Sequence, residues 1–250
     1  ENRMQMGDYT GAVKEFEQYI RITNRSDRLP DSWSNIADAK FRLGDLEGAA
    51  EAWEHLADTY PSSEQAAAAL ASLGRLAYEQ GEFEKSKGYY NRLRDSGGRY
   101  GQSAGVGIGR AQLAMGELLA AKEEFEAVLE ANPANGAARN GLGEVLISQG
   151  DYAGARDVLE PVTRQGISES GAEGMVLIGR SHRLEGNQEV ALEVFGTVQA
   201  LYEAFDEWVA QAIYESAVIH ILQGEPGKAR LRLQEILQSY NGTRAADMAA

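Results

Sequence analysis

One short turn recurs along the whole of this 250-residue chain. Its clearest copy is Gly44-Asp45-Leu46, which follows one amphipathic segment and precedes another. Six further glycines repeat it at intervals of 34 to 38 residues, giving the series Gly7, Gly44, Gly81, Gly116, Gly150, Gly186 and Gly224. A period of this length fits a supersecondary unit of two helices joined by a tight turn. Because such units pack only on their neighbours, the chain is expected to form a helical solenoid.

The residues around each turn also repeat. In the second unit, Trp33, Ile36 and Ala37 mark the first helix (helix A), and Ala49 and Trp53 mark the second (helix B). Helix A carries a small residue in each unit: Ala37, Gly74, Gly109, Gly143, Gly179 and Ala217. Helix B carries a bulky residue nine positions after the turn glycine: Trp53, Tyr90, Phe125, Leu159, Phe195 and Leu233. We expect the small residues to let the helices approach closely, and Trp53, Tyr90, Phe125 and Phe195 to be buried between units.

This pattern resembles the tetratricopeptide repeat (TPR) family, whose signature is W-x2-L-G-x2-Y, then A-x3-F, then P. The resemblance covers nearly the full length and implies an all-α, right-handed superhelix of about seven repeats. It predicts a single solenoid over residues 1–250, with a partial first repeat in 1–24 and an eighth repeat beginning at 243–250. Because both end repeats are incomplete, the sequence indicates a piece of a longer protein.

A second resemblance rests on the phrase from Asp58 to Ser63 and the alanine-rich segment after it. It is similar to TPR proteins of the bacterial envelope, such as those of outer-membrane assembly and the Tol–Pal system. It implies a location in the bacterial periplasm or cell envelope, with the cytoplasm as the alternative.

Composition narrows the choice of partner. The net charge is −14, from 38 acidic and 24 basic side chains, so the chain repels phosphate backbones and anionic membranes. There is no cysteine, which excludes disulfides and thiolate metal sites. No apolar run approaches the roughly 20 residues that span a bilayer, so direct membrane insertion is not expected. These features favour a protein or peptide partner and no nucleic acid.

Motifs that would indicate catalysis fail on their context. Gly101 to Gly105 matches G-x-S-x-G, but a loop at 95–100 stands where a nucleophile elbow needs a strand. Gly224 to Ala229 contains Gly-Lys without the spacing of a phosphate-binding loop. No metal-site spacing surrounds the three histidines, His55, His182 and His220. We therefore expect no enzyme, no catalytic residue, no metal and no cofactor.

The helix A residues carry the functional expectation. TPR helices A line a concave groove that binds peptides, and the position after the small residue points into it. Here that position holds Asp38, Arg75, Arg110, Glu144, Arg180 and Val218. Tyr78 and Arg183 lie three residues after Arg75 and Arg180 on the same helical faces, and the resemblance to the TPR family puts Asn140 at a position of its carboxylate-clamp pattern, without the matching lysines. The candidate partner-binding residues are therefore Arg75, Tyr78, Arg110, Asn140, Arg180 and Arg183. Arginine forms forked hydrogen bonds with carboxylates, which predicts an acidic partner segment or a C-terminal carboxylate. The alternative is that these arginines pair with glutamates of the same chain.

Two functions follow from the repeats. The first is a protein-interaction scaffold that holds a partner segment in its concave groove, in a bacterial envelope assembly. The alternative is a structural spacer or oligomerisation module that acts through the ends of the solenoid.

Overall fold

The computed structural model describes residues 2–23, 25–97 and 100–250. Every regular element in these ranges is a helix, and none is a strand. Glu1 and Asn24, which bound the partial first repeat expected from the sequence, lie outside the described residues. The chain forms two compact units, Glu1–Glu117 (unit 1) and Leu118–Ala250 (unit 2). The single solenoid expected over residues 1–250 stays a prediction.

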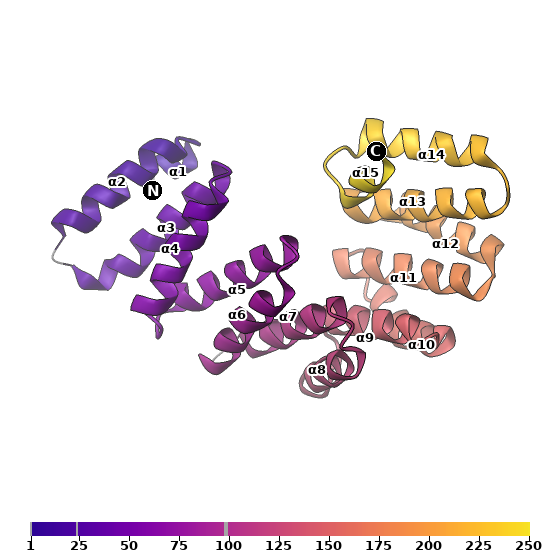
Figure 1. The fold of residues 1–250 in the computed structure, drawn as a ribbon, viewed down its shortest axis with the longest axis horizontal. Coiled ribbons are helices and arrows are strands. Elements are labelled where there is room, and N and C mark those ends of the chain that lie inside the picture. The colour runs from indigo at the N-terminus through magenta and orange to yellow at the C-terminus, as the bar shows by residue number, and fades with distance from the viewer. Residues whose placement is uncertain (1, 24, 98–99) are drawn as a thin grey trace. The chain divides into compact units, whose positions relative to one another are not determined.

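Unit 1 alternates helices A and B in the order that the turn glycines predict (Figure 1). Its helices A are α1 (Asn2–Gln5), α3 (Leu29–Arg42), α5 (Glu64–Glu79) and α7 (Gly101–Ala114). Its helices B are α2 (Tyr9–Ile22), α4 (Leu46–Thr59) and α6 (Phe83–Asp95), with the short 3-10 helix η1 (Ser26–Arg28) before α3.

Unit 2 continues the alternation, beginning with a helix B. Its helices B are α8 (Leu118–Ala131), α10 (Tyr152–Thr163), α12 (Gln188–Leu201) and α14 (Pro226–Ser239). Its helices A are α9 (Gly136–Ser148), α11 (Glu169–Glu185), α13 (Asp206–Leu222) and α15 (Arg244–Ala249). The helix predicted at 243–250 is therefore present as α15, and Thr243 caps its first turn by accepting from the Ala246 amide.

The turns form as predicted, because all seven glycines have a positive φ between 74° and 97°. A side chain in this left-handed conformation is strained, which is why glycine recurs there. At Gly44 the amide donates to the carbonyl of Phe41, and the next amide, of Asp45, donates to Lys40, each at 3.0 Å. The Asp45 carboxylate then caps α4 by accepting from the Gly48 amide at 3.0 Å. One glycine–aspartate pair thus ends one helix and starts the next.

Glycines of helices A receive the bulky residues of helices B. A methyl group added at Gly141 of α9 would lie 2.3–2.7 Å from the ring of Phe125 on α8. A methyl group at Gly179 would similarly meet Phe195 at 2.4–2.8 Å. Phe125 and Phe195 are fully buried and Trp53 is 3% exposed, so the sequence prediction is confirmed for these three.

Tyr90 departs from that prediction, because it is only half-buried. Its ring lies between Gly74 of α5 and Gly107 of α7, where added methyl groups would come within 2.5–3.0 Å of it. With no side chain on either glycine, the ring passes between the two helices A and its outer end stays accessible. The glycine-rich segment at 101–114 therefore has the close-packing role that the sequence indicates.

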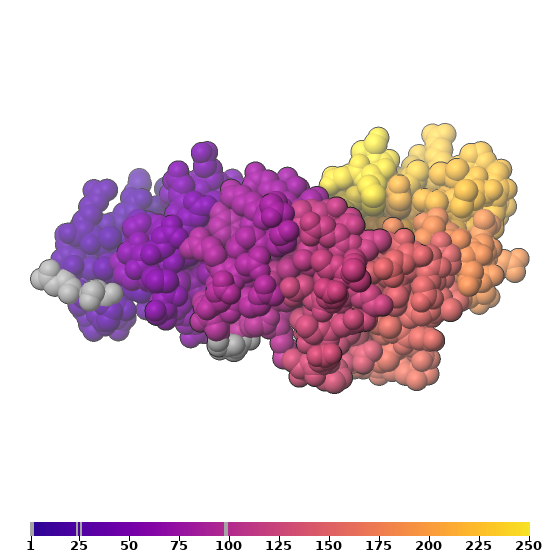
Figure 2. Space-filling view, turned by 60° about the horizontal axis from the view of Figure 1, so that its bottom comes forward, coloured from indigo at the N-terminus to yellow at the C-terminus, as the bar shows by residue number. Residues whose placement is uncertain are grey.

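Helices A form the inner layer of each unit. In unit 1, α3 packs on α5 and α5 on α7; in unit 2, α9 packs on α11 and α11 on α13. Within each unit the colours of consecutive repeats form successive bands, since each repeat contacts its neighbours (Figure 2). The side chains on the open face of these inner helices are the ones available to a partner.

The contact between Gly141 and Phe125 predicts a specific mutational penalty. Gly141→Ala should lower the free energy of unfolding by about 1–3 kcal/mol, because the added methyl group overpacks a ring that cannot move. Gly196→Ala is the matched control in the same unit, since nothing lies within 4 Å of its added methyl group. The control should be neutral or stabilise by up to about 1 kcal/mol through helix propensity. Urea unfolding measures both, and equal stability of the two variants would contradict the packing described.

Candidate functional site

The helix A face of unit 1 carries the best-formed candidate site, which we call the α5–α7 site and define by Arg75, Tyr90 and Arg110. Arg75 lies on α5 and Arg110 on α7, at equivalent repeat positions, and Tyr90 lies on α6, which packs against both helices. Gly74 and Gly107 leave room for the tyrosine ring between α5 and α7. Arg75 directly follows Gly74, and Arg110 comes three residues after Gly107, so each arginine lies within one helical turn of a glycine that the ring contacts.

The electrostatics of Tyr90 agree with this geometry. Burial raises the pKa of its phenol, and the positive charges of Arg110 and Arg75 oppose that shift. Both arginines are thus close enough to the hydroxyl to act on it. The phenol stays protonated near neutral pH, so it can donate a hydrogen bond.

Arg75 and Tyr78 are held by contacts that leave them accessible. The Arg75 guanidinium lies 5.8 Å from the ring centroid of Phe41 on α3. It also lies 4.0 Å from Glu79, a pair in which both side chains are at least half exposed. The ring of Tyr78 packs against Phe83 with centroids 5.3 Å apart. Exposed pairs of this kind contribute at most about 1 kcal/mol, so a partner can displace them.

Asp38 is partly enclosed by the protein. The residue is exposed to solvent, yet burial by surrounding protein raises the pKa of its carboxyl group, against the effect of Arg42. The carboxyl group is therefore accessible but not fully hydrated. Asp38 stands on α3 at the position equivalent to Arg75 and Arg110.

Asn140, one of the three candidates in unit 2, lies in the interior. It is 1% exposed, and its side-chain amide donates to the carbonyl of Ser170 at 2.9 Å and to Glu173 at 2.8 Å. These bonds join α9 to α11. The residue therefore has a structural task, and its contact with a partner stays a prediction.

Arg180 and Arg183 form the intramolecular pairs that the sequence left open. Arg180 on α11 lies 3.5 Å from Glu144 on α9. Arg183 donates to Glu215 on α13 at 2.7 Å, with side chains only 16% and 7% exposed. The six predicted residues are thus split, with Arg75, Tyr78 and Arg110 in unit 1 and Asn140, Arg180 and Arg183 in unit 2. A role for the latter three in partner binding stays a prediction.

Sequence reasoning assigned Tyr90 to the core and so missed it as a site residue. A signal was available in the series of bulky helix B residues. Tyr90 alone among them carries a hydroxyl, and glycines stand on both helices A that flank it. A hydroxyl on a residue of the packing series, with glycines on both neighbouring helices, indicates a side chain whose polar end can reach the surface.

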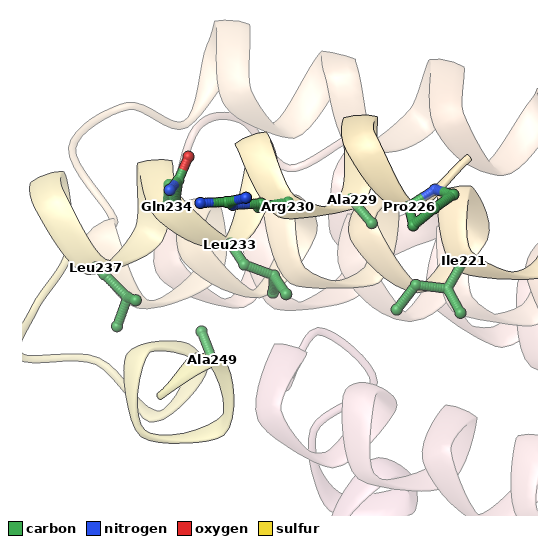
Figure 3. A pocket seen from close by; sticks show the side chains of 8 residues that line it. All are labelled: Ile221, Pro226, Ala229, Arg230, Leu233, Gln234, Leu237 and Ala249. Carbon is green, nitrogen blue, oxygen red and sulfur yellow. The ribbon is translucent and has the colours of Figure 1, made fainter. Parts of the chain in front are cut away.

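The last repeat offers a different surface, an apolar groove of about 330 Å³ between α13, α14 and α15 (Figure 3). Ile221, Leu233 and Leu237 point to the same side, the side on which Ala249 of α15 lies (Figure 3). Leu233 is half-buried and Leu237 is 41% exposed, whereas Phe125 and Phe195, which match Leu233 in their repeats, are fully buried. This end of the chain is the more apolar candidate surface.

No three histidine, aspartate or glutamate side chains of residues 2–23, 25–97 and 100–250 are arranged to hold a metal ion. In the same part of the chain, no helix combines the length and apolar character needed to cross a membrane. Gly101 to Gly105 forms the first turn of α7; in the loop before it, Gly98 and Arg99 lie outside the described residues.

Comparison with known proteins decides the family. The tetratricopeptide repeat family model matches residues 34–100 and 106–169, more than half of the chain. The chain belongs to the tetratricopeptide repeat family. It is also similar to a tetratricopeptide repeat protein from Parabacteroides merdae, with a TM-score of 0.80, 18% identity, and coverage of 96% of this chain and 91% of that one.

Two further proteins are similar to this chain at lower identity or over a shorter segment. The APC/C hetero-tetramer Cut9–Hcn1 matches with a TM-score of 0.69 and 15% identity, over 99% of this chain and 46% of that one. The Arabidopsis thaliana protein "CTR9 homolog" is 26% identical over 147 residues, which is 56% of this chain. The matched segment spans 13% of that relative's length. At these identities the solved structures support the fold alone.

The buried ion pair of Arg183 and Glu215 predicts an effect on the stability of this TPR chain. Arg183→Ala should lower the free energy of unfolding by about 3–5 kcal/mol, since it leaves Glu215 buried without a counter-charge. Arg164→Ala is the control, because its partner Glu160 and its own side chain are 55% and 73% exposed. The control should change the free energy by about 1 kcal/mol at most. Similar losses in urea unfolding for the two variants would argue against a buried pair.

Proposed function

We propose that this TPR chain is a protein-interaction scaffold whose α5–α7 site binds an acidic segment of a partner protein. The observation that carries the proposal is the placement of Arg75 and Arg110 on adjacent helices A, beside the glycines that the Tyr90 ring contacts, in a chain with net charge −14. Binding of protein partners by the helix A face is the general use of the TPR fold. The acidic character of the segment follows from the guanidinium groups, which match carboxylates.

Unit 1 is favoured over unit 2 because of how the arginines are engaged. Arg183 is committed to a buried pair, and displacing it would leave Glu215 uncompensated. Arg75 takes part in an exposed pair at 4.0 Å, which costs little to exchange. A partner carboxylate therefore competes more readily in unit 1.

The positive charge of Arg75 and Arg110 also favours an acidic partner segment over a basic one. A basic patch on an acidic surface raises the local concentration of acidic segments and repels basic ones, which increases the association rate for the correct partner. Exposed ion pairs are screened over about 8–10 Å near physiological ionic strength, so binding should weaken with salt.

A double charge reversal tests the proposal. Arg75→Glu with Arg110→Glu should lower the affinity for the partner, captured with the wild-type protein, by about tenfold or more at low salt, mainly through the on-rate. The matched control is Arg164→Glu with Arg232→Glu, since both arginines lie in unit 2 in exposed pairs with Glu160 and Glu235. Both double variants change the net charge equally.

Surface plasmon resonance with the captured partner measures the two rates. Full binding by the Arg75/Arg110 variant, or equal losses in both variants, would overturn the proposal. Circular dichroism of each variant confirms that the helices remain intact.

A second candidate function is association of copies of this chain through the C-terminal groove. It is favoured by the exposed apolar residues that line this groove, Ile221 at 57% and Leu237 at 41%. Ile221→Glu with Leu237→Glu should convert an associated species to monomer in light scattering at rising concentration. A wild-type chain that stays monomeric throughout would remove this candidate.

An envelope location remains a proposal resting on the phrase from Asp58 to Ser63. That phrase has structural tasks here, since Ser63 caps α5 by accepting from the Ala66 amide at 3.0 Å and Asp58 accepts from Arg92 at 2.5 Å. Helix capping and a bridge between α4 and α6 explain both residues without reference to a compartment.

A further inference from the structure

Tyr90 stands out among the bulky helix B residues because it alone carries a hydroxyl group. The hydroxyl of its neighbour Tyr89 donates a hydrogen bond to Glu54 on α4. Over the described residues, the Tyr90 hydroxyl makes no hydrogen bond. A half-buried donor left without an acceptor costs free energy unless water or a ligand supplies one.

The surroundings of that hydroxyl select the kind of acceptor. Arg75 and Arg110 stand beside the glycines that the ring contacts, and their positive charges act on the phenol. A neutral carbonyl would accept from the hydroxyl but would gain nothing from these two charges. A carboxylate satisfies both, because it accepts several charge-assisted hydrogen bonds at once.

Gly74 and Gly107 fix the position of the Tyr90 ring, and so the place where an acceptor can meet its hydroxyl. Gly74 and Gly107 present no side chain to the ring, which therefore stands directly in the gap between α5 and α7. Repeats four and six have phenylalanine, Phe125 and Phe195, at the same position, and both are fully buried. The ring is thus the structural part that repeats share, and the accessible hydroxyl is specific to this repeat.

We propose that the Tyr90 hydroxyl donates a hydrogen bond to a bound carboxylate, and that the Arg75 and Arg110 guanidinium groups pair with the same carboxylate. The site takes one carboxylate of a partner chain, from a side chain or a C-terminus. This inference rests on the proposed function and deepens it, because it assigns the position and the hydrogen-bond donor for the acidic group.

Three glycine-based pentapeptides with acetylated N-termini are suitable probes. The first has a central glutamate and an amidated C-terminus, and the second is the same peptide with glutamine in place of glutamate. The third is all glycine and has a free C-terminal carboxylate. Binding is followed by NMR through the backbone amides of Gly74 and Gly107. We expect at least one carboxylate peptide to shift these amides, and the stronger of the two identifies the source. The glutamine peptide should leave them unchanged.

Tyr90→Phe provides the decisive variant. It removes only the hydroxyl and leaves the ring that packs on the glycines, so the thermal midpoint should be unchanged. Because a hydrogen bond to a charged group contributes about 1.5–3 kcal/mol, the dissociation constant of the bound carboxylate peptide should rise tenfold or more. Tyr89→Phe is the matched control, since that hydroxyl serves Glu54, and it should bind the peptide as wild type does.

The outcomes separate this inference from the proposed function. An unchanged dissociation constant in Tyr90→Phe, with binding lost in the Arg75/Arg110 variant, overturns the role of Tyr90 and leaves the groove function standing. If neither carboxylate peptide shifts Gly74 or Gly107, the carboxylate site itself is refuted. An equal effect of Tyr89→Phe would also refute it, because the loss would then reflect a general disturbance of α6.

Discussion

The contact of a bulky helix B residue with a glycine of a neighbouring helix A underlies this structure. A methyl group at Gly141 or Gly179 would fall inside the van der Waals radius of Phe125 or Phe195. Helices can approach closely only where one of them lacks a side chain, so these positions set the spacing within each unit. Dispersion forces and removal of apolar surface from water then stabilise each repeat on the next. Everything on the helix A face is positioned by this packing.

The α5–α7 site arises from the same contact in one repeat. Tyr90 meets glycines on both sides, Gly74 and Gly107, and its ring passes into the inner layer instead of ending in the core. A side chain that its repeat position would place among the packing residues thereby stays only half-buried, and the charges of Arg110 and Arg75 act on its phenol. The ring contributes to stability, and the hydroxyl is the group that we propose for recognition.

The fold could be predicted from the sequence because its determinants are local. The turn glycines need positive φ, and the small and bulky positions recur with the repeat, so both are visible without coordinates. The site was predictable only in part. The register placed Arg75 and Arg110 on one face, but the pairing of Arg183 with Glu215 depends on side chains 32 residues apart. Burial of Asn140 by α11 likewise depends on packing between repeats, which composition and period do not specify.

Photo-crosslinking tests the central claim, that a partner binds the helix A face of unit 1, most directly. A benzophenone amino acid would replace Tyr78 on α5 in one variant and Leu231 on α14, which is 66% exposed, in another. Irradiation with the captured partner should yield a crosslinked product from position 78 and little or none from position 231. A product from position 231 alone would contradict the account, because the partner would then contact α14 of unit 2.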